Sequence, residues 1–143
     1  MKYVRLLFAA LTCTLLSACA SRFEAVKSRS LGNSPRTVHI VAESDDGDAG
    51  IKNAVTQELL GRGFKVTERQ SCKDGFKLGF SDDWKWDIVM YLWTLDLRLV
   101  DENTGEVTAA ARFWHGGLHT YPNNTQVVKK LFRKLDEVGA FKD

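Results

Sequence analysis

The sequence has no apolar run long enough to cross a membrane as a helix, and almost no excess of either charge. Its N-terminal apolar run, residues 6–16, holds about ten apolar residues, whereas a membrane-spanning helix needs roughly 20. The chain carries 20 Lys and Arg against 18 Asp and Glu, and Lys2 and Arg5 account for the difference. Because the rest of the chain is balanced, nothing in it indicates binding to nucleic acid.

Motifs of the common catalytic and metal sites are also missing. There is no nucleophile elbow, no zinc motif, no glycine-rich phosphate loop and no convincing pair of carboxylates. The acidic loop 43–48 lacks the regular oxygen-ligand spacing of a calcium site. His115 and His119 are four residues apart, but Gly116-Gly117 between them disfavours the helix that would bring both to one metal. We therefore expect no enzyme activity, no metal and no cofactor.

The N-terminus has the parts of an export signal in the expected order. A short basic segment at residues 1–5 precedes the apolar run, and small residues follow it before a candidate cleavage site. The last four residues of this signal region are Leu16, Ser17, Ala18 and Cys19. This tetrapeptide closely resembles the lipobox of bacterial lipoprotein signals. The resemblance implies removal of residues 1–18, diacylglycerol on the Cys19 sulfur and acylation of its new amine. An ordinary secretory signal that happens to contain a cysteine is the alternative.

Lipidation would make Cys19 a membrane anchor. Each buried CH₂ of an acyl chain contributes about 0.8 kcal/mol, so several chains hold a protein stably. The residue after the cysteine is Ala20 and not Asp, which would be a signal for retention in the inner membrane. By resemblance to enterobacterial sorting signals, this implies the outer membrane, with the domain facing the periplasm.

Cysteine is scarce in the part of the chain that would remain. Cys13 leaves with the signal and Cys19 carries lipid, so Cys72 has no intramolecular partner. We interpret Cys72 as a small, semi-buried residue near a loop. A catalytic thiol or an intermolecular disulfide is the alternative, although no Cys–His motif surrounds it.

Residues 19–37 predict a flexible tether behind the lipidated cysteine. They lack a hydrophobic period and contain Ser, Gly, Asn and Pro. Their charges are mostly basic, so attraction to anionic lipid headgroups is an alternative to a merely solvated linker. We expect residues 38–143 to form one domain.

Hydrophobic periodicity predicts the elements of this domain. In order they are a strand at 38–42, a helix at 49–61, a strand at 64–68, a short edge strand around 76–80, two long strands flanking 101–105, and a helix that Asn124 or Thr125 caps and that ends near 138. The first three form a βαβ-like unit. Together they predict an α/β (α+β) fold, a two-layer sandwich in the order β-α-β-(β)-β-β-α. Both helices would cover one face of a mixed sheet of four to five strands.

Two registers are possible for the hairpin over residues 86–115, and the one that buries apolar side chains against each other is predicted. Pairing Glu102 with Glu106 places Asp96 opposite Arg112, an opposite-charge pair that contributes roughly 0.2–1 kcal/mol. The apolar pairs in this register are Leu95 with Phe113, Leu97 with Ala111, and Leu99 with Ala109. We also expect a glycine bulge at Gly105.

The start of the hairpin is apolar on both faces. Successive strand residues point to opposite faces, and the odd-numbered set from Val89 to Leu99 is predicted to be buried. The even-numbered set there is also apolar, although it would lie on the open face of the sheet: Trp86, Ile88, Met90 and Leu92. Exposed apolar patches usually mark contacts, so we hypothesise that these four residues bind a protein partner. Cover by another part of the chain is the alternative.

Several short segments of the hairpin carry a family resemblance. They are Trp86-Asp87, Tyr91-Leu92, Leu95 to Leu99, Asp101, Thr104-Gly105-Glu106-Val107, Ala111-Arg112 and Gly116. Behind a lipobox, this pattern resembles a class of small uncharacterised Gram-negative envelope lipoproteins. More distantly, the layout is similar to the α/β domains of envelope-assembly lipoproteins and to the TolB amino-terminal domain. Fold alone does not carry function.

These observations leave two hypotheses for function. The first is a lipid-anchored, non-enzymatic envelope protein that binds or assists a protein partner. The second is a module that binds a small ligand or lipid through aromatic residues, namely Trp84, Trp86, Tyr91, Trp93 and Trp114.

Overall fold

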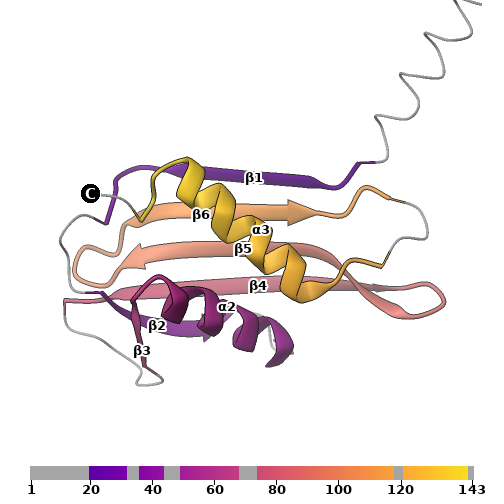
Figure 1. Ribbon diagram of the computed structural model, residues 1–143, viewed down its shortest axis with the longest axis horizontal. Helices are drawn as coiled ribbons and strands as arrows, with labels where there is room; N and C mark the ends of the chain where they lie inside the picture. The colour runs from indigo at the N-terminus through magenta and orange to yellow at the C-terminus, as the bar shows by residue number, and fades with distance from the viewer. Residues whose placement is uncertain (1–19, 32–35, 44–48, 68–73, 118–120, 142–143) are drawn as a thin grey trace, which may run out of the picture.

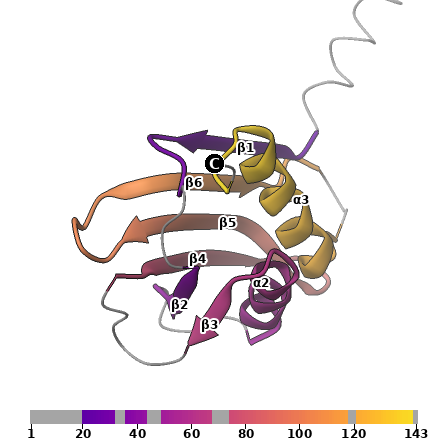
Figure 2. The ribbon, with the colours of Figure 1, turned by 60° about the vertical axis from the view of Figure 1, so that its left-hand side comes forward.

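The computed structural model describes residues 20–31, 36–43, 49–67, 74–117 and 121–141. Its elements are β1 (Arg22–Lys27), β2 (Thr37–Ala42), α2 (Ala49–Gly61), β3 (Lys65–Thr67), β4 (Phe76–Trp86), β5 (Met90–Asp101), β6 (Val107–Trp114) and α3 (Asn124–Glu137). The strands form one mixed sheet in the order β1-β6-β5-β4-β2-β3. Both helices lie on the same face of this sheet (Figure 1, Figure 2). The predicted α+β class is confirmed, with six strands in place of four or five.

The βαβ unit forms as its periodicity predicts. β2 runs parallel to both β3 and β4, with α2 connecting β2 to β3. Ile51, Val55 and Leu59 recur at helical spacing and are buried under α2.

Helix α3 also has its predicted limits and buried stripe. The Asn123 side-chain oxygen accepts a hydrogen bond from the Gln126 N–H at 3.1 Å, so Asn123 caps the helix one residue before the predicted position. Gly139 takes a positive φ of 71° just beyond its end. The stripe is Val127, Val128, Leu131, Phe132 and Leu135.

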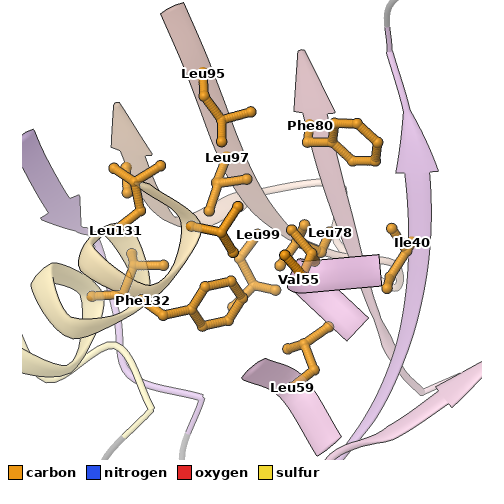
Figure 3. Packing of buried hydrophobic residues seen from close by; sticks show 14 of the residues in the cluster. Ile40, Val55, Leu59, Leu78, Phe80, Leu95, Leu97, Leu99, Leu131 and Phe132 are labelled. Carbon is orange, nitrogen blue, oxygen red and sulfur yellow. The ribbon is translucent and has the colours of Figure 1, made fainter. Parts of the chain in front are cut away.

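The core lies between the helices and the inner face of the sheet. Figure 3 shows leucines of β5 and aromatic residues of β4 and α3 directed into this layer. The predicted hairpin register is confirmed over residues 95–99, because Leu95 pairs with Phe113, Leu97 with Ala111 and Leu99 with Ala109. The predicted pair of Glu102 with Glu106 is wrong, because the register shifts beyond Leu99 and the Asp101 N–H donates to the Glu106 carbonyl at 3.0 Å. Asp96 pairs with Arg112 on the opposite face.

The bulge in this hairpin lies at Thr108, not at Gly105. Ala109 pairs with Leu99 and Val107 pairs with Val100, so Thr108 is the extra residue. Its hydroxyl donates to the Leu99 carbonyl at 3.1 Å, which accommodates the irregularity inside the protein. Gly105 still has a positive φ of 72°. Its N–H donates to the Asp101 carbonyl at 2.8 Å and closes the turn.

The expected edge strand around residues 76–80 is the first half of a long inner strand. β4 continues to Trp86 between β2 and β5, and its later part pairs with β5 alone. The polar run Ser81-Asp82-Asp83 has the composition of a loop, but in the structure it belongs to this strand. Trp84 donates its indole N–H to an Asp82 carboxylate oxygen at 2.6 Å, which satisfies both groups locally.

The predicted tether is wrong for residues 22–31. Arg22 to Lys27 form β1, and each of these residues pairs with β6. Phe23 and Ala25 pack against the core, Leu31 is buried, and the Leu31 N–H donates to the Ala140 carbonyl at 3.2 Å. The physical reason is that β6 would otherwise present an unpaired edge. Residues 32–35, the next part of the predicted tether, lie outside the described ranges.

Asp101 ties β1 to the hairpin turn. Its carboxylate contacts the Arg29 guanidinium and accepts the backbone N–H groups of Asn103 and Thr104. Burial by itself would raise the pKa of Asp101, but the two backbone hydrogen bonds and Arg29 together hold that pKa below its usual value.

We predict that Asp101→Asn lowers the free energy of unfolding by about 1–2 kcal/mol at neutral pH, since it removes charge-assisted hydrogen bonds. A carboxylate with a lowered folded-state pKa stabilises the fold above the unfolded pKa of about 3.9, and this contribution is lost as pH falls through the folded-state pKa. Urea unfolding should therefore separate wild type from variant at pH 7, and the gap should close at lower pH. Glu106→Gln, at an exposed position of the same turn, is the control. A gap that persists unchanged into acid would contradict the prediction.

Candidate functional site

Three of the four residues of the hypothesised patch lie at the tip of the β4–β5 hairpin. Trp86 and Met90 form its last pair, and residues 87–89 make the turn. The side chains are strongly exposed, at 75% for Trp86, 76% for Ile88 and 57% for Met90. Val89, which was predicted to be buried, is exposed as well. We call Trp86, Ile88, Val89 and Met90 the apolar tip.

Leu92, the fourth predicted patch residue, is fully buried. Asp83 pairs with Thr94 and Trp84 pairs with Leu92, so Trp93 is an extra residue in β5. A bulge of this kind reverses the alternation of side chains. Leu92 therefore points to the same face as Leu95, and strict alternation along the strand assigned it to the wrong face.

The apolar tip projects beyond the end of the neighbouring strands. Arg22 of β1, Trp114 of β6, Thr94 of β5 and Asp83 of β4 lie in one row across the sheet. Past this row only β4 and β5 continue, and they add the pairs of Trp84, Lys85 and Trp86 with their partners on β5. At about 3.3 Å per residue these pairs extend roughly 10 Å. Figures 1 and 2 show the β4–β5 turn and the start of strand β1 at the same end of the sheet.

The first described residue, Ala20, lies within the folded domain at this end. A Cβ atom on Gly116 would come within 2.5 Å of the Ala20 carbonyl oxygen, so the two backbones are in close contact. A hollow of about 410 Å³ separates this segment from the base of the tip. It is lined by Ala20, Arg22, Lys85, Asp87, Tyr91, Trp93, Trp114, His115, Gly116 and Gly117.

The hollow combines cations with aromatic rings. The Lys85 ammonium lies 3.7 Å from the centroid of Trp93, and the Arg22 guanidinium lies 5.7 Å from that of Trp114. Both are cation–π geometries. Asp87 is the one acidic residue in the lining, against these two cations. We call Ala20, Arg22 and the residues of β4 and β5 that line this hollow the Ala20 end of the sheet.

His115 is a buried residue of this end. It is 2% exposed, with the rings of Tyr91 and Trp93 packed edge-on against it. Its Nδ1 lies 3.4 Å from the Ser21 hydroxyl. Within the ranges that the structure describes, no three His, Cys, Asp or Glu side chains gather closely enough to hold a metal ion. His119 and Cys72 lie outside those ranges.

The sheet face away from the helices is polar. Arg112 and Asp96 form the predicted pair, with Nε and Oδ1 2.5 Å apart, and this hydrogen bond raises the pKa of Arg112. They line a shallow hollow of about 380 Å³ together with Arg22, Glu24, Thr94 and Trp114. Trp114 is 44% exposed there. We call this surface the open face.

The aromatic residues of the ligand-binding hypothesis are only partly brought together. Tyr91, Trp93 and Trp114 line the hollow of the Ala20 end. Trp84 packs against the core, and Trp86 belongs to the apolar tip.

Sequence reasoning did not find Arg22 or Lys85 as members of this site. Arg22 was assigned to a tether, and Lys85 was assigned to no predicted element. Only the strand pairing across the sheet brings these residues to one end, and no local pattern carries that information.

The predicted lipidation residues, Leu16, Ser17, Ala18 and Cys19, lie outside the described ranges, as does the rest of the export signal. Among the described residues, neither helix has the length and hydropathy that a membrane crossing requires.

No protein-family model matches this sequence, and no curated protein matches it as a relative. Solved structures do match the fold. A PelC dodecamer from Paraburkholderia phytofirmans is similar at a TM-score of 0.58 and 12% identity, over 86% of this chain and 100% of that one. A PDZ domain protein from Parabacteroides distasonis gives 0.52 and 10%, over 94% of this chain and 40% of that one. Lipoprotein GNA1162 from Neisseria meningitidis gives 0.46 and 11%, over 76% and 100%. The first two likenesses show a shared fold.

Proposed function

We propose that this chain is a lipid-anchored protein of the bacterial envelope that acts by binding a protein partner, without catalysis. The observation that carries the proposal is the position of Ala20. This residue follows the predicted lipidated Cys19 directly, and it already lies against Gly116 in the folded domain. A lipid on Cys19 would therefore hold the whole domain at the membrane surface, with no long linker between them. Ala20 after the cysteine favours the outer membrane and a domain that faces the periplasm.

The open face is the surface that we assign to the protein partner. It is uncovered by the helices, and it offers Arg22, Arg112 and Trp114 around a shallow hollow. Arginine and tryptophan are enriched among the residues that dominate protein interfaces. The Asp96–Arg112 pair adds charge of both signs, which favours specific pairing.

The first partner to test is another copy of this chain. PelC, which shares the fold over its whole length, is a dodecamer in its solved structure. At 12% identity this likeness motivates the experiment, because closed assemblies of identical subunits are common.

The anchor is tested by mass spectrometry of the mature N-terminus. We expect a first residue at Cys19 with the added mass of acyl chains, and the protein in the membrane fraction. Replacing residues 1–19 by an ordinary cleavable export signal should release a soluble periplasmic domain, since the acyl chains supply the membrane affinity. A mature N-terminus without acyl mass, or one that begins elsewhere, would reject the anchor.

The partner surface is tested by photo-crosslinking in intact cells from position 98, which is exposed on the open face. We expect a product of twice the mass of the chain. Position 129, exposed on α3 on the opposite side of the sheet, is the matched control and should give little product. A different captured protein would reject self-association but keep a protein partner. Equal capture from both positions, or none, would argue against the open face.

A further inference from the structure

We propose that the apolar tip inserts into the headgroup and upper acyl region of the membrane that carries the Cys19 lipid. This inference deepens the proposed function and rests on its lipid anchor. It also changes the occupant expected for Trp86, Ile88 and Met90, from a protein partner to a lipid surface.

The first argument is reach. Two chain steps separate Ala20 from Arg22, and consecutive Cα atoms are about 3.8 Å apart, so Ala20 lies within roughly 8 Å of the row that contains Arg22. A lipid on Cys19 would be attached one residue before Ala20. The apolar tip extends roughly 10 Å beyond the same row. It extends from the end of the sheet at which β1 begins, which is also the end where Ala20 lies. A membrane reached by the acyl chains is therefore within reach of the tip.

The second argument is the chemistry of the tip. Four apolar side chains are exposed on a projecting hairpin, and the most exposed are Trp86 and Ile88. Tryptophan is enriched at membrane–water interfaces, where its ring lies at the level of the headgroups. Lys85 and Arg22 line the hollow behind the tip and can face lipid phosphates, with Asp87 as the one opposing charge in that lining.

The third argument is shape. A stable protein interface buries about 800 Å² on each partner. The tip is a narrow turn with few side chains, whereas the neighbouring open face is broad. A narrow apolar projection beside a lipid attachment point matches a membrane surface better than it matches a second protein.

Two contacts with the membrane would also fix the orientation of the domain. The lipid would hold the domain near the start of β1, which is an edge strand of the sheet. The apolar tip belongs to β4 and β5, which are inner strands, so the two contacts would lie at separate points along the same end of the sheet. With both in contact, the strands rise away from the bilayer and the open face remains accessible from the side.

The test is fluorescence quenching of the lipidated mature chain on vesicles of phosphatidylethanolamine and phosphatidylglycerol, with and without bromine on the acyl chains. We expect brominated lipid to quench part of the tryptophan emission. Trp86→Phe should abolish most of that quenched fraction, because the ring at position 86 is the one inserted. Trp86→Phe combined with Val107→Trp is the matched control, because it places an exposed ring at the opposite end of β6, and brominated lipid should not quench that ring.

A second pair of variants separates insertion from mere proximity. Ile88→Asp with Met90→Asp places charges on the tip, and quenching of Trp86 should fall to the level seen without bromine. Val107→Asp, an exposed apolar position at the opposite end of β6, should change nothing. Far-ultraviolet circular dichroism verifies that each variant folds.

The outcomes distinguish this inference from the anchor beneath it. If the purified chain carries no acyl mass, the lipid anchor is wrong, and the inference falls with it. If the acylated chain binds vesicles but Trp86 is not quenched, the anchor stands and the insertion is rejected. A photo-crosslinker at position 88 should capture phospholipid in cells; capture of a protein or of a second copy would overturn the proposal.

Discussion

A chain shortened to begin at residue 37 should fail to fold as a stable domain, whereas one that begins at Ala20 should fold. The shortened chain loses strand β1, which pairs with β6 along its whole length. It also loses Phe23, whose ring lies 5.0 Å from that of Phe113, and the buried Leu31. Each buried apolar side chain of this size contributes about 1.5–3 kcal/mol. The free energy of unfolding of a small domain is only roughly 5–15 kcal/mol. Losing both side chains together with strand β1 would remove a large part of it.

The comparison is made on the two soluble chains without lipid, by circular dichroism and urea unfolding. Phe23→Ala in the longer chain should lower the free energy of unfolding by about 2–4 kcal/mol, as partial loss of a core aromatic residue does. Val26→Ser, at an exposed β1 position, should change it by less than about 0.5 kcal/mol. If the shortened chain unfolds at the same urea concentration as the longer one, residues 22–31 are a tether after all.

Leu92→Ala and Ile88→Ala should behave very differently, although both residues belong to the patch that the sequence suggested. Leu92 is fully buried and Ile88 is 76% exposed. Removing a buried leucine side chain leaves a cavity, so Leu92→Ala should lower the free energy of unfolding by about 2–5 kcal/mol. Ile88→Ala removes exposed atoms and should change it by less than about 0.5 kcal/mol.

Urea unfolding of both variants at neutral pH measures this difference. The test also reports on the bulge at Trp93, because without it Leu92 would lie on the open face. Leu95→Ala is the matched control for a buried leucine on the regular side of the bulge, and it should resemble Leu92→Ala. Similar small effects for Leu92→Ala and Ile88→Ala would mean that the strand alternates without interruption.

Several features of this protein can be predicted from the sequence because their causes are local. Helix α2 has its predicted limits because apolar residues recur at helical spacing and Gly63 adopts a positive φ just after it. The register of the long hairpin follows from burial, since a shift by one residue would place Arg112 opposite Leu95. The anchor remains a prediction from a tetrapeptide motif, which needs no tertiary structure to be recognised.

The tertiary structure alone decided which residues share the end of the sheet where Ala20 and the apolar tip lie. β1 is short and flanked by residues typical of linkers, so only its pairing with β6, far along the chain, makes it a strand. The bulge at Trp93 moves Leu92 into the core and leaves Trp86, Ile88 and Met90 on a projecting tip. Pairing across the sheet then brings Ala20 and Arg22 beside that tip. These relations depend on contacts between distant segments, and such contacts leave no periodic pattern in the sequence.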